Sequence, residues 1–259
     1  MRMLRSTAWI VALTGALASP AAAEHLVTSL SSHRVLITSN FVGEEIVLFG
    51  SIERDAQSPA RRGGYDVIVT VTGPRQTMVV RRKDRVFGVW VNAESRTFVN
   101  VPSYLAVLAT RPIDAITDAA TLQRNQIGLE RTLLRQVFGP DIADVGRDDP
   151  MRMAFLRLKM EQNLYSERGN AVTFLTPTLI RAVIPIPANV LVGNYDVDVK
   201  VFADGAPITR DTSAMEVIKV GVEQLVAAAA HEHAILYGLT TMMMALMTGW
   251  LASVVFRKD

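Results

Sequence analysis

The chain has 259 residues, no cysteine, and 27 Lys and Arg against 25 Asp and Glu. The absence of cysteine excludes disulfide bonds, a lipidated cysteine anchor and thiol catalysis. Arg2 and Arg5 lie in a segment that we expect to be removed, so the mature chain would have 25 residues of each sign. Without a basic excess to neutralise phosphates, nucleic acid is not an expected partner.

Residues 1–23 have the pattern of a secretory signal peptide. Two arginines precede the apolar run 8–17, and small residues before position 24 fit the sites that a signal peptidase reads. Cleavage after Ala23 would start the mature chain at Glu24. The alternative, an uncleaved N-terminal anchor, would need a longer apolar run, because a bilayer core is about 30 Å thick.

After the signal peptide the sequence predicts an all-β beginning. Short apolar stretches alternate with turn residues, notably Gly63-Gly64 and Gly73-Pro74. The segment 66–71 alternates with period two, as a strand with one buried face does. The expected strands are 34–38, 45–52, 66–71, 77–81, 86–91 and 97–101.

The pattern changes to helical spacing between residues 112 and 168, which we interpret as a helical insertion that ends before Gly169. Asp149 and Pro150 fit the N-cap and the first position of a helix, after a polar loop at 139–149. The expected apolar stripes are Ile113, Ile116 and Ala120; Leu133, Leu134, Val137 and Phe138; and Met151, Phe155 and Leu158.

Strands return after the insertion, and residues 24–220 predict one periplasmic domain, a mainly β, immunoglobulin-like β-sandwich. Tyr195 resembles the tyrosine corner of such sandwiches, whose hydroxyl bonds to upstream backbone, although an ordinary core tyrosine is the alternative. Two domains split near residue 112 are the alternative organisation. The later strands are expected at 172–175, 179–186, 192–201 and 208–220, with Asp204-Gly205 as a hairpin turn. Within 192–201 the residues alternate, with an apolar face at 195, 197, 199 and 201 and a polar face at 196, 198 and 200.

The C-terminal part predicts a single membrane span after a juxtamembrane helix at 221–233. Residues 234–256 contain no charge over 23 positions, which is about 35 Å of helix. The basic tail 257–259 predicts a cytoplasmic C terminus, with the β domain in the periplasm and the span in the inner membrane. The alternative is a buried core helix, against which Tyr237 and Trp250 near the helix ends argue.

The sequence offers little for histidine-based catalysis. The four histidines lie at 25, 33, 231 and 233, and no nucleophile elbow, Walker loop or His-Glu-x-x-His motif is present. A metal site at 231–233 is disfavoured, since helix neighbours two apart point about 200° from each other. We expect no catalytic residues, no metal and no cofactor. A carboxylate-dependent enzyme stays open because of Asp141, Asp144, Asp148 and Asp149, for which a solvated, helix-capping loop is the alternative.

One dense basic cluster lies at 81–85, between two expected strands and close to aromatic residues. It could contact lipid headgroups, an acidic protein or an anionic ligand. A charged strand edge that discourages pairing with other chains is the alternative. The partner-binding hypothesis names Arg81, Arg82, Arg85, Trp90 and Tyr104.

Small residues recur every four positions in the expected span. Such a stripe permits close approach of another helix, although small residues are also common in spanning segments generally. The helix-packing hypothesis names Thr241, Ala245, Gly249 and Ser253.

Several short runs distinguish the sequence: VVRRKDR and GVWVN within 79–92, VPSYLAV at 101–107, TRP at 110–112, IPANV at 186–190, VGNY at 192–195, KVG at 219–221 and GWLA at 249–252. In these runs the chain resembles an alphaproteobacterial transmembrane protein family of unknown function. The similarity covers nearly the whole chain after the signal peptide, and the chain departs from it around 131–147. The resemblance implies that the protein resides in a membrane, and it carries over no established activity. It also implies that the gene lies close to genes for sulfite or organosulfonate exporters.

The leading hypothesis is a non-enzymatic accessory or interaction module, tethered so that it meets an inner-membrane protein at high effective concentration. Its partners would be the bilayer and a membrane protein, with such an exporter as the candidate. The contrasting hypotheses are a periplasmic carboxylate-dependent enzyme and a metal or small-molecule sensor. A pocket joining buried carboxylates would favour the enzyme, and an exposed patch at 81–90 would favour the interaction module.

Overall fold

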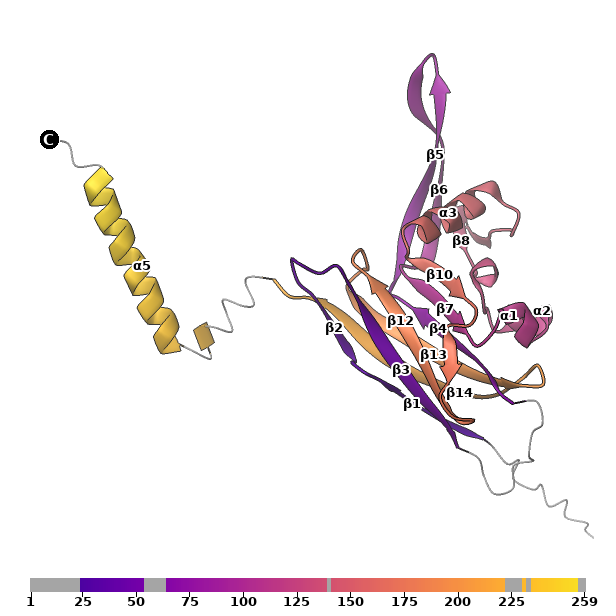
Figure 1. The fold of residues 1–259 in the computed structure, drawn as a ribbon. Coiled ribbons are helices and arrows are strands. Elements are labelled where there is room, and N and C mark those ends of the chain that lie inside the picture. The colour runs from indigo at the N-terminus through magenta and orange to yellow at the C-terminus, as the bar shows by residue number, and fades with distance from the viewer. Residues whose placement is uncertain (1–23, 54–63, 139–140, 222–229, 232–233, 256–259) are drawn as a thin grey trace, which may run out of the picture.

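The computed structural model describes residues 24–53, 64–138, 141–221, 230–231 and 234–255. The expected signal peptide and cytoplasmic tail lie outside the described residues, as does most of the expected juxtamembrane helix, of which Ala230 and His231 are helical. Two β-sheets stack on a common apolar core, and the insertion covers the outer face of the larger sheet (Figure 1). The chain is therefore mainly β, as predicted.

The smaller sheet has four antiparallel strands in the order β1-β3-β12-β11. Pro185 and Pro187 of β12 lie beyond the short partner β11, where the missing N–H groups interrupt no ladder on that side. The strands are β1 (His25–Leu30), β3 (Gly43–Glu53), β11 (Val172–Phe174) and β12 (Leu179–Pro187).

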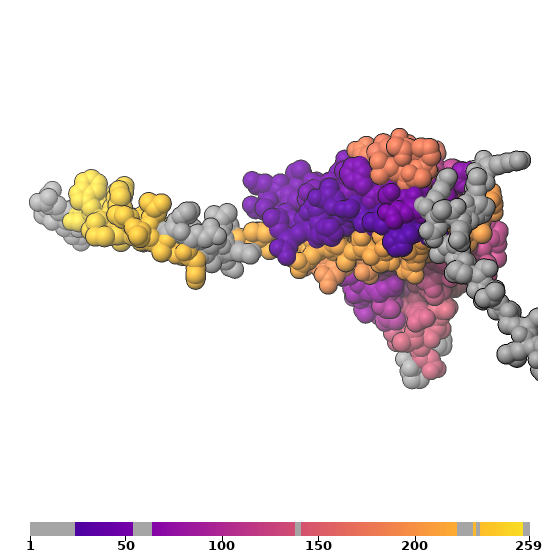
Figure 2. Space-filling view, turned by 90° about the horizontal axis from the view of Figure 1, so that it is seen from below, coloured from indigo at the N-terminus to yellow at the C-terminus, as the bar shows by residue number. Residues whose placement is uncertain are grey.

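The larger sheet has six strands in the order β10-β7-β4-β13-β14-β2. Its inner face supplies core residues from both sides of residue 112, so the β domain has one continuous main core. The strands are β2 (Arg34–Ile37), β4 (Asp66–Thr72), β7 (Leu105–Ala109), β10 (Tyr165–Arg168), β13 (Gly193–Ala203) and β14 (Ala206–Lys219). In Figure 2 the violet strands of the smaller sheet, the orange β14 and the pink insertion follow one another as layers.

The alternation predicted along β13 is present. Tyr195, Val197 and Val199 are fully buried in the main core, and the intervening positions face the other way. The Tyr195 hydroxyl donates to the Leu191 carbonyl at 2.6 Å, which is the upstream contact expected of a tyrosine corner. Burial raises the pKa of Tyr195 to about 12. The immunoglobulin-like classification itself stays a prediction.

A third sheet, in the order β5-β6-β8-β9, carries a long hairpin. The predicted strand at 86–91 was wrong, because a two-residue turn at Phe87-Gly88 divides it. Both turn residues have positive φ, +49° and +84°, which is the type I′ pattern, but Phe-Gly is not one of its usual sequence signals. The strands are β5 (Arg75–Val86), β6 (Val89–Pro102), β8 (Arg135–Phe138) and β9 (Asp141–Asp144).

The insertion is only partly helical. The predicted N-cap is confirmed, since the Asp149 carboxylate accepts from the N–H groups of Met151 and Arg152. The helical stripe predicted through 138 and the loop predicted at 139–149 were wrong in part, because β8 pairs with the open edge of β6 and with β9. Leu158 is exposed, contrary to the predicted stripe. The helices are α1 (Ile113–Ile116), α2 (Ala119–Arg124), the 3₁₀ turn η1 (Leu129–Arg131) and α3 (Pro150–Glu161).

A single described helix, α5 (Ala234–Val255), is long and apolar enough to cross a membrane. A window of 18 residues within this 22-residue helix has a mean hydropathy of 1.5, and no residue of the helix is buried against the rest of the protein. The absence of burial argues against the alternative of a core helix. The expected span 234–256 therefore corresponds to α5, with its last residue outside the described part.

Candidate functional site

The hairpin of β5 and β6 projects from the domain as an arm (Figure 1). We define the arm as residues 81–93, because every one of them is exposed, whereas Met78 and Val80 below it pack against the main core. Six residues of β5 lie in the arm, which at about 3.3 Å per residue gives roughly 20 Å of projection. The arm is therefore a free surface on a fixed base.

The tip of the arm is apolar. Phe87 is fully exposed and Trp90 is 67% exposed. Val86 and Val89 pair with each other across the Phe87-Gly88 turn. Large apolar side chains gathered in this way on a projecting turn indicate a contact surface. Phe87 also has a left-handed backbone, which a phenylalanine adopts at a cost of about 1 kcal/mol or more. The turn thus keeps an aromatic side chain where asparagine or glycine would be more stable.

The stem directly behind the tip is cationic. Arg81, Arg82, Lys83 and Arg85 all lie in β5, and only Asp84 interrupts them. The Arg82 guanidinium lies 3.5 Å from the Glu94 carboxylate, and the Arg85 guanidinium donates to the Gly88 carbonyl at 3.2 Å. An apolar tip followed by a cationic stem suits a surface with an apolar interior and anionic groups above it, as a membrane or a membrane protein offers.

The base of the arm is fastened to α3. Phe98 of β6 is fully buried, and its ring centroid lies 5.6 Å from that of Phe155. The Arg96 guanidinium forms an ion pair with Asp149, the N-cap of α3, and a second with Glu94 at 3.0 Å. These contacts fix where the arm leaves the domain while its tip stays unpacked.

The arm and the chain leading to α5 leave the same end of the larger sheet. β4 and β14 both pair antiparallel with β13, so these two strands run in one direction. Thr72, the last residue of β4, and Ala214 of β14 both pair with Asp196. β4 then leads into β5 through Gly73 and Pro74, and β14 continues for five residues before the chain turns towards α5.

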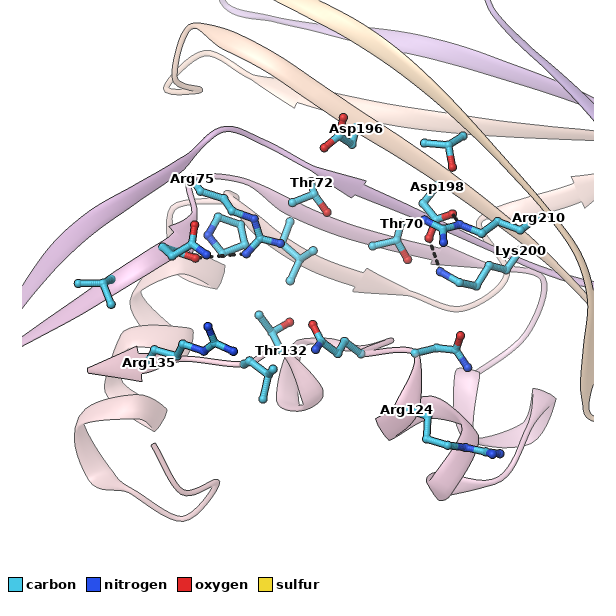
Figure 3. Close-up of a pocket in the computed structure, with 18 residues that line it drawn as sticks. Thr70, Thr72, Arg75, Arg124, Thr132, Arg135, Asp196, Asp198, Lys200 and Arg210 are labelled. Atoms are coloured by element: carbon cyan, nitrogen blue, oxygen red, sulfur yellow. Dashed lines mark hydrogen bonds and ion pairs between the residues drawn. The ribbon is translucent and has the colours of Figure 1, made fainter. Parts of the chain in front are cut away.

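A polar cavity of about 750 Å³ lies between the outer face of the larger sheet and the insertion (Figure 3). The sheet contributes Thr70, Thr72, Asp196, Asp198 and Lys200, and Arg75 lies at the root of the arm. Sequence reasoning missed this cavity. The sequence shows that two strands each have a polar face, but nothing in it indicates that the insertion covers those faces.

Two of the four carboxylates considered for catalysis have structural partners. Asp149 caps α3 and pairs with Arg96, and Asp144 lies 3.2 Å from the Arg135 guanidinium across the β8–β9 hairpin. Within the described residues, no three His, Asp or Glu side chains gather as a group that could hold a metal ion. A second cavity, of about 600 Å³, lies in the insertion and is lined by Asp114, Glu130, Asp148 and Glu167, all of which are exposed and not buried. The arm and the polar cavity at the sheet are the candidate contact surfaces.

A comparison with family models shows which protein family the chain belongs to. A family described as "Putative transmembrane protein (Alph_Pro_TM)" matches residues 25–258. The chain belongs to this family. No curated protein and no solved structure matches significantly. As a member of the Alph_Pro_TM family, the chain is a membrane protein, and α5 is its candidate span.

One of the predicted partner-binding residues of this Alph_Pro_TM protein does not lie on its surface. Tyr104 is 1% exposed, its hydroxyl donates to the Pro185 carbonyl at 2.5 Å, and its ring lies 5.8 Å from that of Tyr195. Burial raises its pKa well above the ordinary value for tyrosine. Tyr104 therefore links the two sheets within the core, and it is not part of the contact surface that we predicted. The structure brings Arg81, Arg82, Arg85 and Trp90 together on the arm.

The small-residue stripe lies on one side of α5, at positions four apart. Thr241 donates its hydroxyl to the Tyr237 carbonyl at 3.0 Å, so its polar group is satisfied within the helix and does not oppose apolar packing. That the stripe formed by Thr241, Ala245, Gly249 and Ser253 binds another helix stays a prediction for this family member.

Proposed function

We propose that this chain is a single-pass inner-membrane protein whose periplasmic β domain is a non-enzymatic interaction module, with the arm as its contact element. The observation that carries the proposal is the arm itself, an exposed aromatic tip on a cationic stem at residues 81–93. Exposed apolar groups of this size and a left-handed Phe87 cost stability, so a contact that uses them explains why they are kept.

The proposed partner is a protein of the same membrane. A tether confines the domain to the membrane surface, which raises the effective concentration of any neighbour by orders of magnitude without a new contact. Weak, local contacts made by one hairpin are then sufficient for association. The resemblance of the sequence to its family adds a sulfite or organosulfonate exporter as the candidate partner, in an accessory role.

Site-specific photocrosslinking in native membranes tests this proposal. A photoreactive amino acid at Trp90 in the full-length chain should give a discrete adduct with one membrane protein. The same amino acid at Arg181, an exposed position on β12 of the smaller sheet, is the matched control and should not. Replacing Arg81, Arg82 and Arg85 with glutamine should lower the adduct yield at position 90 several-fold.

Two results would contradict the proposal. Identical adducts from positions 90 and 181 would mean that the arm has no special contact. A yield at position 90 unchanged by the triple glutamine variant would mean that the cationic stem takes no part. Because residues 81–93 are all exposed and none belongs to the main core, the variants leave the core intact, and an unchanged Tm serves as the folding control.

A further inference from the structure

The outer face of the larger sheet changes its chemistry from strand to strand. Along one row of paired residues, Val107 of β7, Thr70 of β4, Asp198 of β13 and Thr212 of β14 lie side by side. The neighbouring row runs from Ala109 through Ile68 and Lys200 to Arg210. The face is thus apolar at β7, carries both an apolar and a hydroxyl side chain at β4, is charged at β13, and carries a hydroxyl and a guanidinium group at β14.

The insertion covers both parts of this face but packs tightly only against the apolar part. There Ile113, Ile116, Leu122 and Ile127 form a small second core with the sheet. Over the polar part, 124–126 and 132–135 stand away from the sheet, and the cavity of about 750 Å³ remains between them (Figure 3). A volume of this size holds a small molecule.

The roof of the cavity is held in place by a buried arginine. Arg152 of α3 is 3% exposed and donates to the carbonyls of Glu130 and Thr132, at 2.7 Å and 2.8 Å. Thr132, which lines the cavity, therefore has a fixed backbone. The cavity is preformed by structure on both sides, as binding sites for small molecules commonly are.

The lining carries five cations and two carboxylates. Asp198 is shared between Lys200 and the Arg210 guanidinium, the latter at 2.5 Å, and Arg135 pairs with Asp144. Among the described residues, Arg75 and Arg124 have no carboxylate within ion-pair distance; they donate to the Asn100 carbonyl at 3.2 Å and the Thr121 hydroxyl at 3.0 Å. The Arg75 guanidinium reaches into the cavity and keeps most of its capacity for an anion, whereas the Arg124 side chain points away from the cavity (Figure 3).

Two of the lining residues have a left-handed backbone without being glycine. Asn100 has a φ of +56° and Gln126 a φ of +52°. Gln126 follows the last turn of α2, where the N–H groups of Gln126 and Ile127 bond back to Gln123 and Leu122, as in a Schellman motif. Glycine is the usual residue at that position, and a glutamine there costs stability. Its side chain, which lines the cavity, is a functional reason to keep it.

From this geometry we propose that the cavity binds a small organic polyanion that carries hydroxyl groups. Arg75 would pair with one oxyanion group, and Lys200 and Arg210, which share the single carboxylate of Asp198, would attract a second. The hydroxyls of Thr70, Thr72 and Thr132 and the amide of Gln126 would bond to the hydroxylated skeleton between them. The proposal goes beyond the arm's contact function and stands whether or not the arm binds a partner.

Calorimetric titration of the purified full-length chain in detergent tests the proposal. The probes are citrate, for carboxylates, and fructose 1,6-bisphosphate, for phosphates; sorbitol is the neutral control and inorganic phosphate the single-anion control. At least one polyanion should bind with a Kd below roughly 1 mM. It should bind at least tenfold tighter than inorganic phosphate, and added salt should weaken it. Which probe binds better distinguishes the two kinds of anionic group.

Matched variants locate the binding. Arg75→Gln should weaken the bound probe about tenfold or more. Arg181→Gln makes the same charge change at an exposed site on the other sheet and should leave binding unchanged. Gln126→Gly should weaken binding while the Tm stays the same or rises, because glycine relieves the left-handed strain.

The proposal would be overturned by any of three results. Neither polyanion binds more tightly than sorbitol and inorganic phosphate. The Arg75→Gln variant, shown by an unchanged Tm to be folded, binds the probe as the natural chain does. Arg181→Gln weakens binding as much as Arg75→Gln does, which would reduce the effect to general attraction by net charge.

Discussion

Asp149 has two structural roles, as the N-cap of α3 and as the ion-pair partner of Arg96. Both roles bear on the stability of the domain at acid pH. Partial burial alone would raise its pKa, but hydrogen bonds from the Arg96 guanidinium and from the N–H groups of Arg152 and Met151 hold the pKa below its ordinary value. A carboxyl group with a depressed pKa in the folded state stabilises that state above the pKa of the unfolded chain, near 4. That contribution is lost as the pH falls through the lower, folded-state pKa.

Asp149→Asn separates the two roles, because asparagine is also a good N-cap but carries no charge. At pH 7 we expect a loss of about 0.5–1 kcal/mol in the free energy of unfolding, a small value because both side chains of the ion pair are partly exposed. The difference from the natural chain should shrink below pH 4 and vanish below the folded-state pKa. Urea unfolding of the full-length chain between pH 2 and 7 measures it. A constant difference across that range would exclude the ion pair as its source.

At the scale of one element, the residue that would make the turn of the arm most stable differs from the residue that suits the proposed contact. A type I′ turn is most stable with Asn-Gly, and here Phe87 occupies the first position. Phe87→Asn should therefore slow hydrogen exchange of the arm amides and leave the Tm of the domain unchanged, since every residue of the arm is exposed. The photocrosslinking yield at Trp90 should fall, because the tip loses its most exposed apolar group. A yield that rises with turn stability would show that rigidity, and not the phenyl ring, is what the contact needs.

The elements that could be predicted from the sequence are those with a strict period. The alternation along β13 and the Asp149-Pro150 start of α3 each have a direct local cause, and both were confirmed. The turn at Phe87-Gly88 lacks the residues that announce it, so an apolar run of six was interpreted as one strand. β8 forms because the edge of β6 lies within reach, which is a long-range cause that no local pattern contains.

The candidate sites divide in the same way. The basic cluster at 81–85 was visible as a run of charges, and the structure adds that it stands on a projecting arm. Tyr104 could not be separated from that surface by its residue type, since a tyrosine suits both a core and an interface. The cavity joins residues from five regions of the chain, among them Arg75, Arg124 and Lys200, and only the position of the insertion brings them together.

At the scale of the whole molecule, the proposed contact function requires the arm to lie near the membrane. The arm leaves the same end of the larger sheet as the chain that leads to α5. The connecting residues 222–233 can extend to about 40 Å at most, whatever their conformation. A cationic stem behind an aromatic tip is suited to the headgroup level of an anionic bilayer, where tryptophan side chains concentrate.

Trp90 can report whether the tip reaches that level. The chain has three tryptophans, of which Trp9 lies in the predicted signal peptide, so Trp250→Phe leaves Trp90 as the reporter in the mature protein. In vesicles that contain anionic and brominated lipids we expect the fluorescence of Trp90 to be quenched, because bromine quenches only at close range. Replacing Arg81, Arg82 and Arg85 with glutamine should reduce the quenching, as should salt near 1 M, where the Debye length falls to about 3 Å. Unquenched, water-exposed emission from Trp90 in these vesicles would place the tip above the headgroups and leave a protein partner as the only surface that it can contact.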